Sequence, residues 1–171
     1  MSEQIPVVIP TVWNGYHFRS RLEARWAVFF TSLGIAFEYE PEGFDLPSGR
    51  YLPDFLLPHV GMFAEVKPQA LTPAEKRLCV ELVRATGRPC LYLVGTPDFT
   101  AYWASEMFGT DIGDQDYSLD IDQTCRQYYI DERRFYSAPP KLSPDEFTPQ
   151  YWIAVEDARG ARFGVYESEA E

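Results

Sequence analysis

Four polar side chains have types and spacings that suit metal-dependent chemistry: Glu23, Asp54, Glu65 and Lys67. Residues two apart in a strand share a face, so the segment MFAEVK (62–67) places Glu65 and Lys67 together. A carboxylate and an ammonium between apolar residues are costly to bury unless they are paired or bound to a metal. Three carboxylates that converge near an ammonium suit Mg²⁺ better than Zn²⁺, because Mg²⁺ prefers hard oxygen ligands.

A helix is expected to carry Glu23. Residues 16–35 (YHFRSRLEARWAVFFTSLGI) have apolar residues at helical spacing, Ser20 can act as the N-cap, and Gly34 can end the helix. Glu23 lies at the border of the apolar stripe, so packing of this helix on a sheet would bring its carboxylate near the strands. Residues 35–39 then have the composition of a strand.

An antiparallel hairpin is expected to hold Asp54 and Glu65. Residues 51–58 (YLPDFLLP) and 62–67 are short apolar segments, and the His-Val-Gly stretch between them has turn composition. Pairing of the two strands can place Asp54 beside Glu65. The hairpin therefore predicts that two carboxylates meet on one sheet.

A helix and a buried strand complete the predicted core. Residues 72–86 begin with a capping box formed by Thr72 and Glu75, so Glu75 is interpreted as a helix cap and not as a ligand. Residues 89–95 (PCLYLVG) are continuously apolar, which is typical of a strand buried on both faces. A strand, a helix and a further strand in this order predict a right-handed βαβ unit with parallel strands. The order α-β-β-β-α-β over residues 19–95 predicts a compact α/β core.

Charge is divided unevenly along the chain. The net charge of −11 is made up of −1 over residues 1–95 and −10 over residues 96–171. We expect an extended N-terminal arm (1–12), an α/β core (13–95), and an acidic C-terminal elaboration of the same domain (96–171), because no linker separates the halves. The negative charge of residues 96–171 makes DNA binding to that half less expected, but it does not exclude DNA binding by the rest of the chain.

The second half has weaker structural signals. Residues 111–122 (DIGDQDYSLDID) have loop composition, residues 128–137 indicate a strand, and residues 138–149 form a Pro-rich loop. Residues 151–163 fit a helix and a hairpin equally well. The sequence therefore predicts no motif for this half.

Composition limits the class of protein. The 171 residues fit one domain, and 46% hydrophobic with 24% charged residues is typical of globular proteins. Three cysteines without a CxxC pair indicate reduced thiols in a cytoplasmic protein rather than a disulfide framework or a zinc site. No apolar run approaches the length of a membrane span, and the N-terminal residues lack a signal peptide, so no membrane partner is expected.

Together these features resemble the PD-(D/E)XK nuclease superfamily. The resemblance covers roughly residues 13–95 and rests on an ordered set of residues: Glu23 on the helix, Pro53-Asp54 on one strand and Glu65-Val66-Lys67 on the next. Within the superfamily, FRSRLEARWAVFF followed by EYEP, LPDF and EVK is similar to short nucleases of phages and mobile elements, and more loosely to transposon-end nucleases. The resemblance implies a restriction-endonuclease-like fold, in which helices flank a mixed central sheet.

The resemblance also implies an activity and a cofactor. The activity is Mg²⁺-dependent endonucleolytic hydrolysis of DNA phosphodiester bonds, with Mn²⁺ able to substitute for Mg²⁺. By match to the motif, the metal ligands would be Asp54, Glu65, the main-chain carbonyl of Val66 and, as the helical carboxylate of many members, Glu23. Lys67 would be the catalytic lysine.

DNA is expected to approach over the near-neutral half of the chain. Arg19, Arg21 and Arg25 lie near the start of the first helix and could bind phosphates there. Few such cations are present, so we expect weak DNA binding by the free chain. A protein partner or a second copy of the chain would then supply the missing affinity.

Simpler interpretations of the same residues remain open. Glu23 could cap the helix with Ser20, Asp54 could mark a strand kink, and Glu65 with Lys67 could be a surface cross-strand pair. Arginines on a helix commonly lie on its solvated face. The alternative function is a catalytically idle inhibitor or docking subunit with a nuclease fold, which would bind a protein partner through its acidic half.

Overall fold

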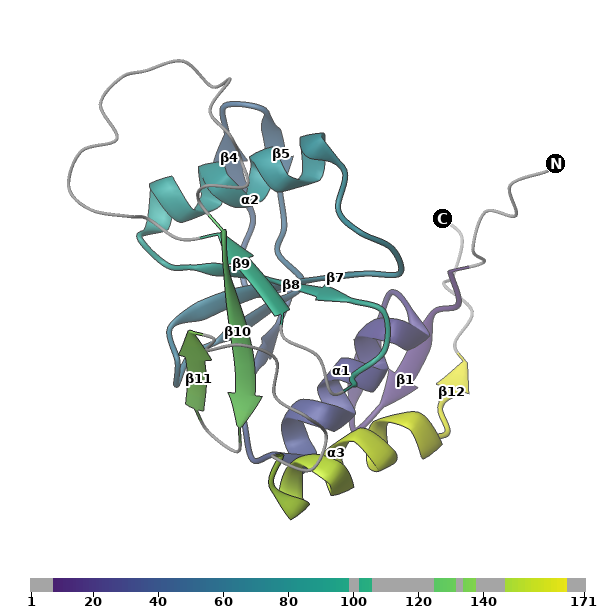
Figure 1. Cartoon of the computed structure of the whole chain (residues 1–171). Helices are drawn as coiled ribbons and strands as arrows, with labels where there is room; N and C mark the ends of the chain where they lie inside the picture. The colour runs from purple at the N-terminus through teal and green to yellow at the C-terminus, as the bar shows by residue number, and fades with distance from the viewer. Residues whose placement is uncertain (1–7, 99–101, 106–124, 132–133, 138–146, 166–171) are drawn as a thin grey trace, which may run out of the picture.

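The computed structural model describes residues 8–98, 102–105, 125–131, 134–137 and 147–165. Figure 1 shows its elements along the chain. They are β1 (Thr11–Trp13), β2 (Tyr16–Phe18), α1 (Arg21–Ser32), β3 (Glu38–Tyr39), β4 (Phe44–Leu46), β5 (Gly49–Tyr51), β6 (Phe55–Leu57), β7 (Met62–Lys67), α2 (Pro73–Thr86), β8 (Cys90–Val94), β9 (Tyr102–Ser105), β10 (Cys125–Asp131), β11 (Arg134–Ser137), α3 (Pro149–Gly160) and β12 (Gly164–Val165).

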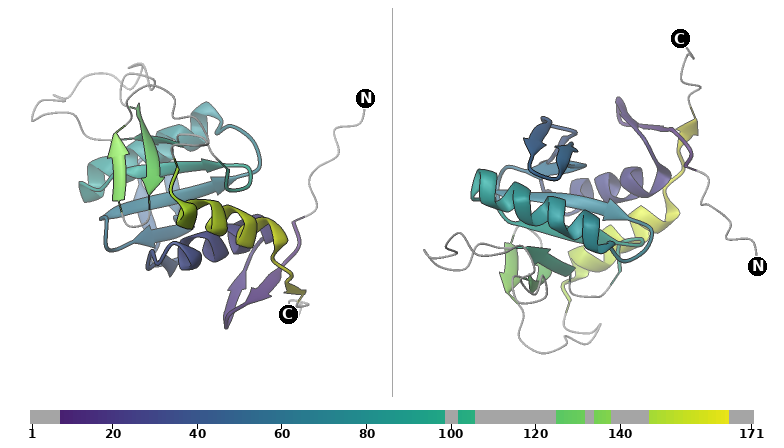
Figure 2. Two further views of the ribbon diagram at one scale, coloured as in Figure 1. Left: turned by 60° about the horizontal axis from the view of Figure 1, so that its bottom comes forward. Right: turned by 90° about the horizontal axis from the view of Figure 1, so that it is seen from above.

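One mixed sheet forms the centre of the molecule. Among the described residues it has seven strands in the order β11-β10-β9-β8-β7-β6-β3. Strands β7 and β8 are parallel, as the βαβ pattern predicts, and the other neighbours are antiparallel. Figures 1 and 2 show α2 on one face of this sheet and α1 with α3 on the other. The prediction of an α/β protein with a mixed sheet flanked by helices is confirmed.

The sheet separates two hydrophobic cores. Ala64 and Val66 of β7 lie in the core beneath α1 and α3, whereas Phe63 lies in the core beneath α2. Because side chains alternate along a strand, Glu65 and Lys67 share the α2 face with Phe63. The same face of β7 therefore carries a large apolar residue and both charged residues of the motif.

The elements of the predicted βαβ unit have the expected bounds. Helix α2 has a capping box between Thr72 and Glu75, and Gly87 ends it in the left-handed conformation with φ of 70°. The buried strand β8 follows directly. Local signals are sufficient here, because the cap, the apolar stripe and the stop all lie within this segment.

The N-terminal segment differs from its prediction. Ser20 is the N-cap of α1, as expected, and the helix begins at Arg21, but Tyr16–Phe18 before it form β2, which pairs with β1 (Thr11–Trp13) at the end of the segment (1–12) expected to be an extended arm. The turn contains Asn14 and Gly15, which both have positive φ, 49° and 80°. Asn-Gly is a strong signal for a two-residue hairpin turn. The hairpin was missed because the aromatic residues of β2 also fit helical spacing.

The segment predicted as one strand over 51–58 is divided in two. Strand β5 ends at Tyr51 and pairs with β4, and β6 begins at Phe55 and pairs with β7. Pro53 lies between them, and proline has no N–H for a sheet ladder. Asp54 therefore lies directly before the first residue of β6 and not within a strand.

The second half of the chain contributes to the same fold. Residues predicted as one strand over 128–137 belong to a β10–β11 hairpin, and residues 151–163 are mainly helical, as part of α3. The loop predicted over 111–122 lies outside the described residues, as does most of the 138–149 loop. Within the part of the chain that the structure describes, no helix is long and apolar enough to span a membrane.

Packing of α3 on α1 yields the first prediction. Tyr151 is fully buried between Phe29 and Phe147, whereas its neighbour Trp152 is 40% exposed. Truncation of a buried aromatic residue leaves a cavity, so Tyr151→Ala should lower the free energy of unfolding by about 3–5 kcal/mol. Trp152→Ala should lower it by less than about 1 kcal/mol. Urea denaturation measures both, and equal losses would show that α3 does not belong to the common core.

Candidate functional site

The β6–β7 ladder ends one residue pair before the motif. The last described pair is Phe55 with Ala64, and continuation of that register would place Pro53 opposite Val66. Phe63 N–H donates to Pro89 and the Lys67 carbonyl accepts from Gly95, so alternate residues of β7 bond to β8. The backbone N–H and C=O of Val66 therefore both point toward β6.

Asp54 takes the place of the missing ladder partner. The Val66 N–H donates to Asp54 Oδ2 at 2.7 Å, so a side chain replaces a strand carbonyl. The Val66 carbonyl lies on the same side, and Pro53 has no N–H to donate to it. This geometry places a carboxylate and a main-chain carbonyl together at the end of the ladder.

Glu65 and Lys67 form an ion pair on the α2 face of β7. Lys67 Nζ lies 3.0 Å from Glu65 Oε1 and 3.3 Å from Glu75 Oε1. The other oxygen of Glu65 accepts a hydrogen bond from the Tyr51 hydroxyl at 2.6 Å. Glu75 is also the cap of α2, as the sequence predicts. The buried carboxylate of Glu65 is thus held in place from two sides.

Glu23 lies at the start of α1 and caps it. The Glu23 N–H donates to Ser20 Oγ, and the Ser20 hydroxyl donates to Glu23 Oε1 at 2.7 Å. The second oxygen accepts from the Tyr39 hydroxyl at 2.6 Å and from the Arg19 N–H at 3.2 Å. The helix-cap interpretation is confirmed. The buried carboxylate also approaches the strands, so the cap does not exclude a further role.

Glu23 and Glu65 both affect the titration of Asp54. Burial raises the pKa of Asp54, and the negative charges of Glu65 and Glu23 raise it further, against the opposing effects of the Val66 N–H and Arg19. Burial disfavours the charged form of Lys67, but Glu65, with Asp54 and Glu75, raises its pKa above the ordinary value. The site therefore combines crowded negative charge with one firmly protonated lysine.

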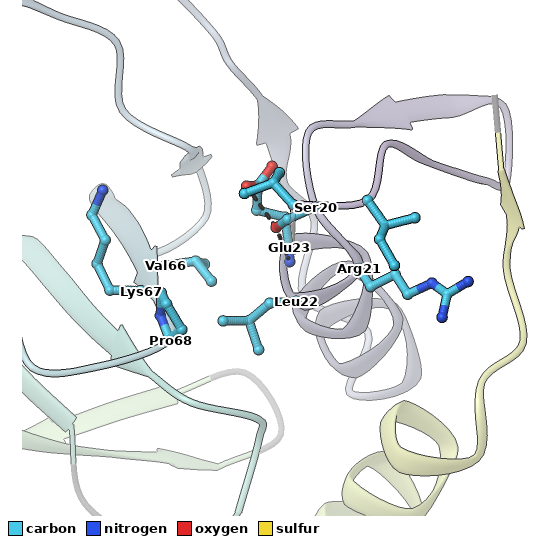
Figure 3. Close-up of a pocket in the computed structure, with 9 residues that line it drawn as sticks. Ser20, Arg21, Leu22, Glu23, Val66, Lys67 and Pro68 are labelled. Atoms are coloured by element: carbon cyan, nitrogen blue, oxygen red, sulfur yellow. Dashed lines mark hydrogen bonds between the residues drawn. The ribbon is translucent and has the colours of Figure 1, made fainter. Parts of the chain in front are cut away.

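The three candidate phosphate-binding arginines have different surroundings. Arg19 Nη2 contacts Asp54 Oδ1 at 2.5 Å, and Arg19 Nε contacts Glu40 Oε1 at 2.7 Å. Arg21 is exposed, and Figure 3 shows its side chain turned away from Glu23. Arg19 and Arg21 therefore both lie at the start of α1 near the site.

Arg25 lies elsewhere. Its guanidinium donates to the carbonyls of Ala158 and Arg159 at the C-terminal end of α3 and lies over the ring of Phe163. A cation at that end satisfies helix carbonyls that have no partner within the helix. The structure therefore does not bring Arg25 together with the carboxylates.

A pocket of about 370 Å³ opens between the start of α1 and the end of β7. Glu23 and Lys67 line it from opposite sides, as Figure 3 shows, and Leu22, Val66 and Pro68 form apolar parts of its wall. Asp54 and Glu65 are buried and are not among the residues that line it. A substrate in the pocket would meet both a carboxylate and an ammonium.

The donor atoms fit a hard divalent cation. Asp54 and Glu65 supply carboxylate oxygens, and Val66 supplies a carbonyl that lacks a strand donor; these are the ligand types that Mg²⁺ and Mn²⁺ prefer. Among the described residues, no three His, Cys, Asp or Glu side chains already form a metal-binding group. In the structure, Arg19 pairs with Asp54, and Lys67 pairs with Glu65.

Three supporting residues were missed in the sequence. They are Tyr39, which bonds to Glu23, Glu40, which bonds to Arg19, and Tyr51, which bonds to Glu65. The pairing of β3 with β6 carries Glu40 to Asp54, whose carbonyl accepts the Glu40 N–H. Pairing of residues 35–39 with residues 51–58 would have predicted Glu40 at the site. No local spacing predicts Tyr51.

Comparisons of the chain with protein-family models, with curated proteins and with solved structures find no match. The site is therefore interpreted from its geometry and from the sequence motif.

The raised pKa of Asp54 predicts a pH dependence of stability. The folded protein holds this proton to higher pH than the unfolded chain, whose aspartate titrates near about 4. The contribution of protonated Asp54 to the free energy of unfolding is therefore fully present below about pH 4. It is lost as the pH rises through the pKa of Asp54 in the folded protein. In EDTA, Asp54→Asn should reduce this fall in the free energy of unfolding, whereas Asp45→Asn, at an exposed position of β4, should not. Denaturation at several pH values measures the slopes, and identical slopes in all three proteins would contradict this account.

Proposed function

We propose that this chain is a Mg²⁺-dependent DNA endonuclease that hydrolyses phosphodiester bonds at the end of β7. The observation that supports the proposal most is the early end of the β6–β7 ladder. It sets Asp54 and the Val66 carbonyl side by side, next to the Glu65–Lys67 pair. Such a cluster of acidic oxygens beside a lysine, open to a pocket through Lys67, suits phosphodiester hydrolysis better than a purely structural role.

Under this proposal, the groups of the site divide into metal ligands and one lysine that stabilises charge. When bound, Mg²⁺ would supply a water of lowered pKa and stabilise charge on the phosphoryl group. Asp54, Glu65 and the Val66 carbonyl would hold it. Lys67 stays protonated because its pKa is raised, so it acts by charge and hydrogen bonding and not as a base.

The fold and the substrate are part of the proposal. We place the mixed sheet and its flanking helices in the restriction-endonuclease-like group, with an acidic C-terminal elaboration. DNA would approach over the half that includes Arg19 and Arg21, since residues 96–171 carry a net charge of −10. A protein partner or a second copy of the chain would add affinity.

Cleavage assays with matched lysine variants test the proposal. Wild type should cut plasmid or single-stranded DNA in Mg²⁺ or Mn²⁺ and not in EDTA. Lys67→Ala removes charge stabilisation of the transition state, so the cleavage rate should fall at least about 100-fold. Lys76→Ala, on α2 outside the site, should retain the wild-type rate.

Two outcomes would contradict the proposal. Equal rates for Lys67→Ala and wild type would exclude the lysine from the reaction. Absence of metal-dependent cleavage of either DNA by folded wild-type protein would favour the alternative, an idle nuclease-fold protein that docks to a partner.

A further inference from the structure

Among the described residues, Arg19 is the cation that forms an ion pair with Asp54. Its side chain is 52% exposed, whereas that of Asp54 is 4% exposed, so the guanidinium extends from solvent to a buried carboxylate. The guanidinium also bonds to Glu40, which is itself partly exposed. Arg19 therefore connects the buried carboxylate of Asp54 to the partly exposed carboxylate of Glu40.

Hydrogen bonds hold the backbone N–H of Arg19, whereas its side chain is half exposed. The Arg19 N–H donates to Glu23 Oε2 and to the Tyr39 hydroxyl at 2.9 Å, directly before the N-cap of α1. A long side chain on a fixed backbone can exchange partners without a change in the fold. Glu40 would keep the guanidinium near the site after such an exchange.

Arg19 bonds to the oxygen of Asp54 that is not bonded to the Val66 N–H. Oδ2 accepts the Val66 N–H, which leaves Oδ1, and Arg19 holds Oδ1. Glu65 has the equivalent arrangement, because Lys67 holds its Oε1. A divalent cation that binds Oδ1 between the two carboxylates would therefore compete with Arg19 for that oxygen.

We infer that Arg19 is a built-in counter-cation, which holds Asp54 in the metal-free protein and is released to bind a substrate phosphate when a divalent cation occupies the site. The inference rests on the proposed function. A guanidinium binds phosphate oxygens through paired N–H donors, so its release would couple metal occupancy to substrate affinity. Metal binding would then increase DNA affinity through Arg19, in addition to its own charge.

Two binding measurements test the inference, and they should change in opposite directions. In calorimetry with Mn²⁺ and no DNA, Arg19→Gln removes the competitor and should tighten Mn²⁺ binding by up to about fivefold. In fluorescence anisotropy with a labelled DNA duplex and Ca²⁺, the same variant should bind DNA several-fold more weakly. It should also show a salt slope smaller by about 0.9, the contribution of one phosphate contact. In EDTA, its DNA affinity should equal that of wild type.

Matched variants separate this role from others. Arg21→Gln removes the same charge two residues along the chain and should leave Mn²⁺ affinity unchanged, since the Arg21 side chain is exposed and turned away from Glu23. Arg19→Lys keeps the charge but cannot bridge two carboxylates as a guanidinium does, so its Mn²⁺ affinity should lie between those of wild type and Arg19→Gln. Circular dichroism checks the fold of each.

The outcomes distinguish the inference from the proposed function. If Mn²⁺ binds wild type but not Asp54→Asn, and Arg19→Gln binds Mn²⁺ no more tightly than wild type, the inference is wrong and the metal site stands. Weaker binding of both Mn²⁺ and DNA by Arg19→Gln and Arg19→Lys would show a structural role and would also overturn it. If folded wild type binds no Mn²⁺, the proposed function fails, and the inference fails with it.

Discussion

The hydrogen bond from the Val66 N–H to Asp54 Oδ2 is the interaction on which the arrangement of the site depends. The strand pairing of β6 with β7 ends at Phe55 and Ala64, and the Asp54 side chain accepts the Val66 N–H in place of a strand carbonyl, while Pro53 has no N–H to donate to the Val66 carbonyl. A longer ladder would occupy both main-chain groups of Val66 and carry Asp54 into the sheet. The early end of the ladder thus places a carboxylate and a main-chain carbonyl at the same position.

The charges around this hydrogen bond are balanced within the chain. Asp54 and Glu65 are buried, and each has one cationic partner, Arg19 and Lys67. Burial of carboxylates is tolerated when such partners and hydrogen bonds compensate it. The partners differ in exposure, since Arg19 is half exposed and Lys67 is less so. We therefore propose that Arg19 leaves Asp54 when a cation binds and that Lys67 remains near Glu65.

Much of the core could be predicted because its signals are local. The cap and stop of α2, the apolar run of β8 and the alternation along β7 each lie within one segment. The shared face of Glu65 and Lys67 followed from alternation alone. The β1–β2 hairpin was missed although Asn14-Gly15 indicates it, because its aromatic residues also fit a helix.

The remaining contacts of the site depend on tertiary packing. Tyr51 reaches Glu65 from the end of a separate hairpin, and Arg25 bonds to α3, more than a hundred residues away along the chain. No residue spacing in the sequence indicates either contact. The pairing of Arg19 with Asp54 likewise depends on where α1 packs against the sheet. Motif residues and their local partners, such as Ser20 for Glu23, could therefore be identified in advance, but the partners that tertiary packing brings could not.

The location of a bound cation tests the central claim most directly. Crystals grown with Mn²⁺ and measured near the manganese absorption edge would show the ion by its anomalous signal. We predict a peak at coordinating distance from Asp54 Oδ1, Glu65 and the Val66 carbonyl, with the Arg19 guanidinium moved from Asp54 toward Glu40. An anomalous peak elsewhere, or none at this position in crystals that hold Mn²⁺ at saturating concentration, would contradict the account.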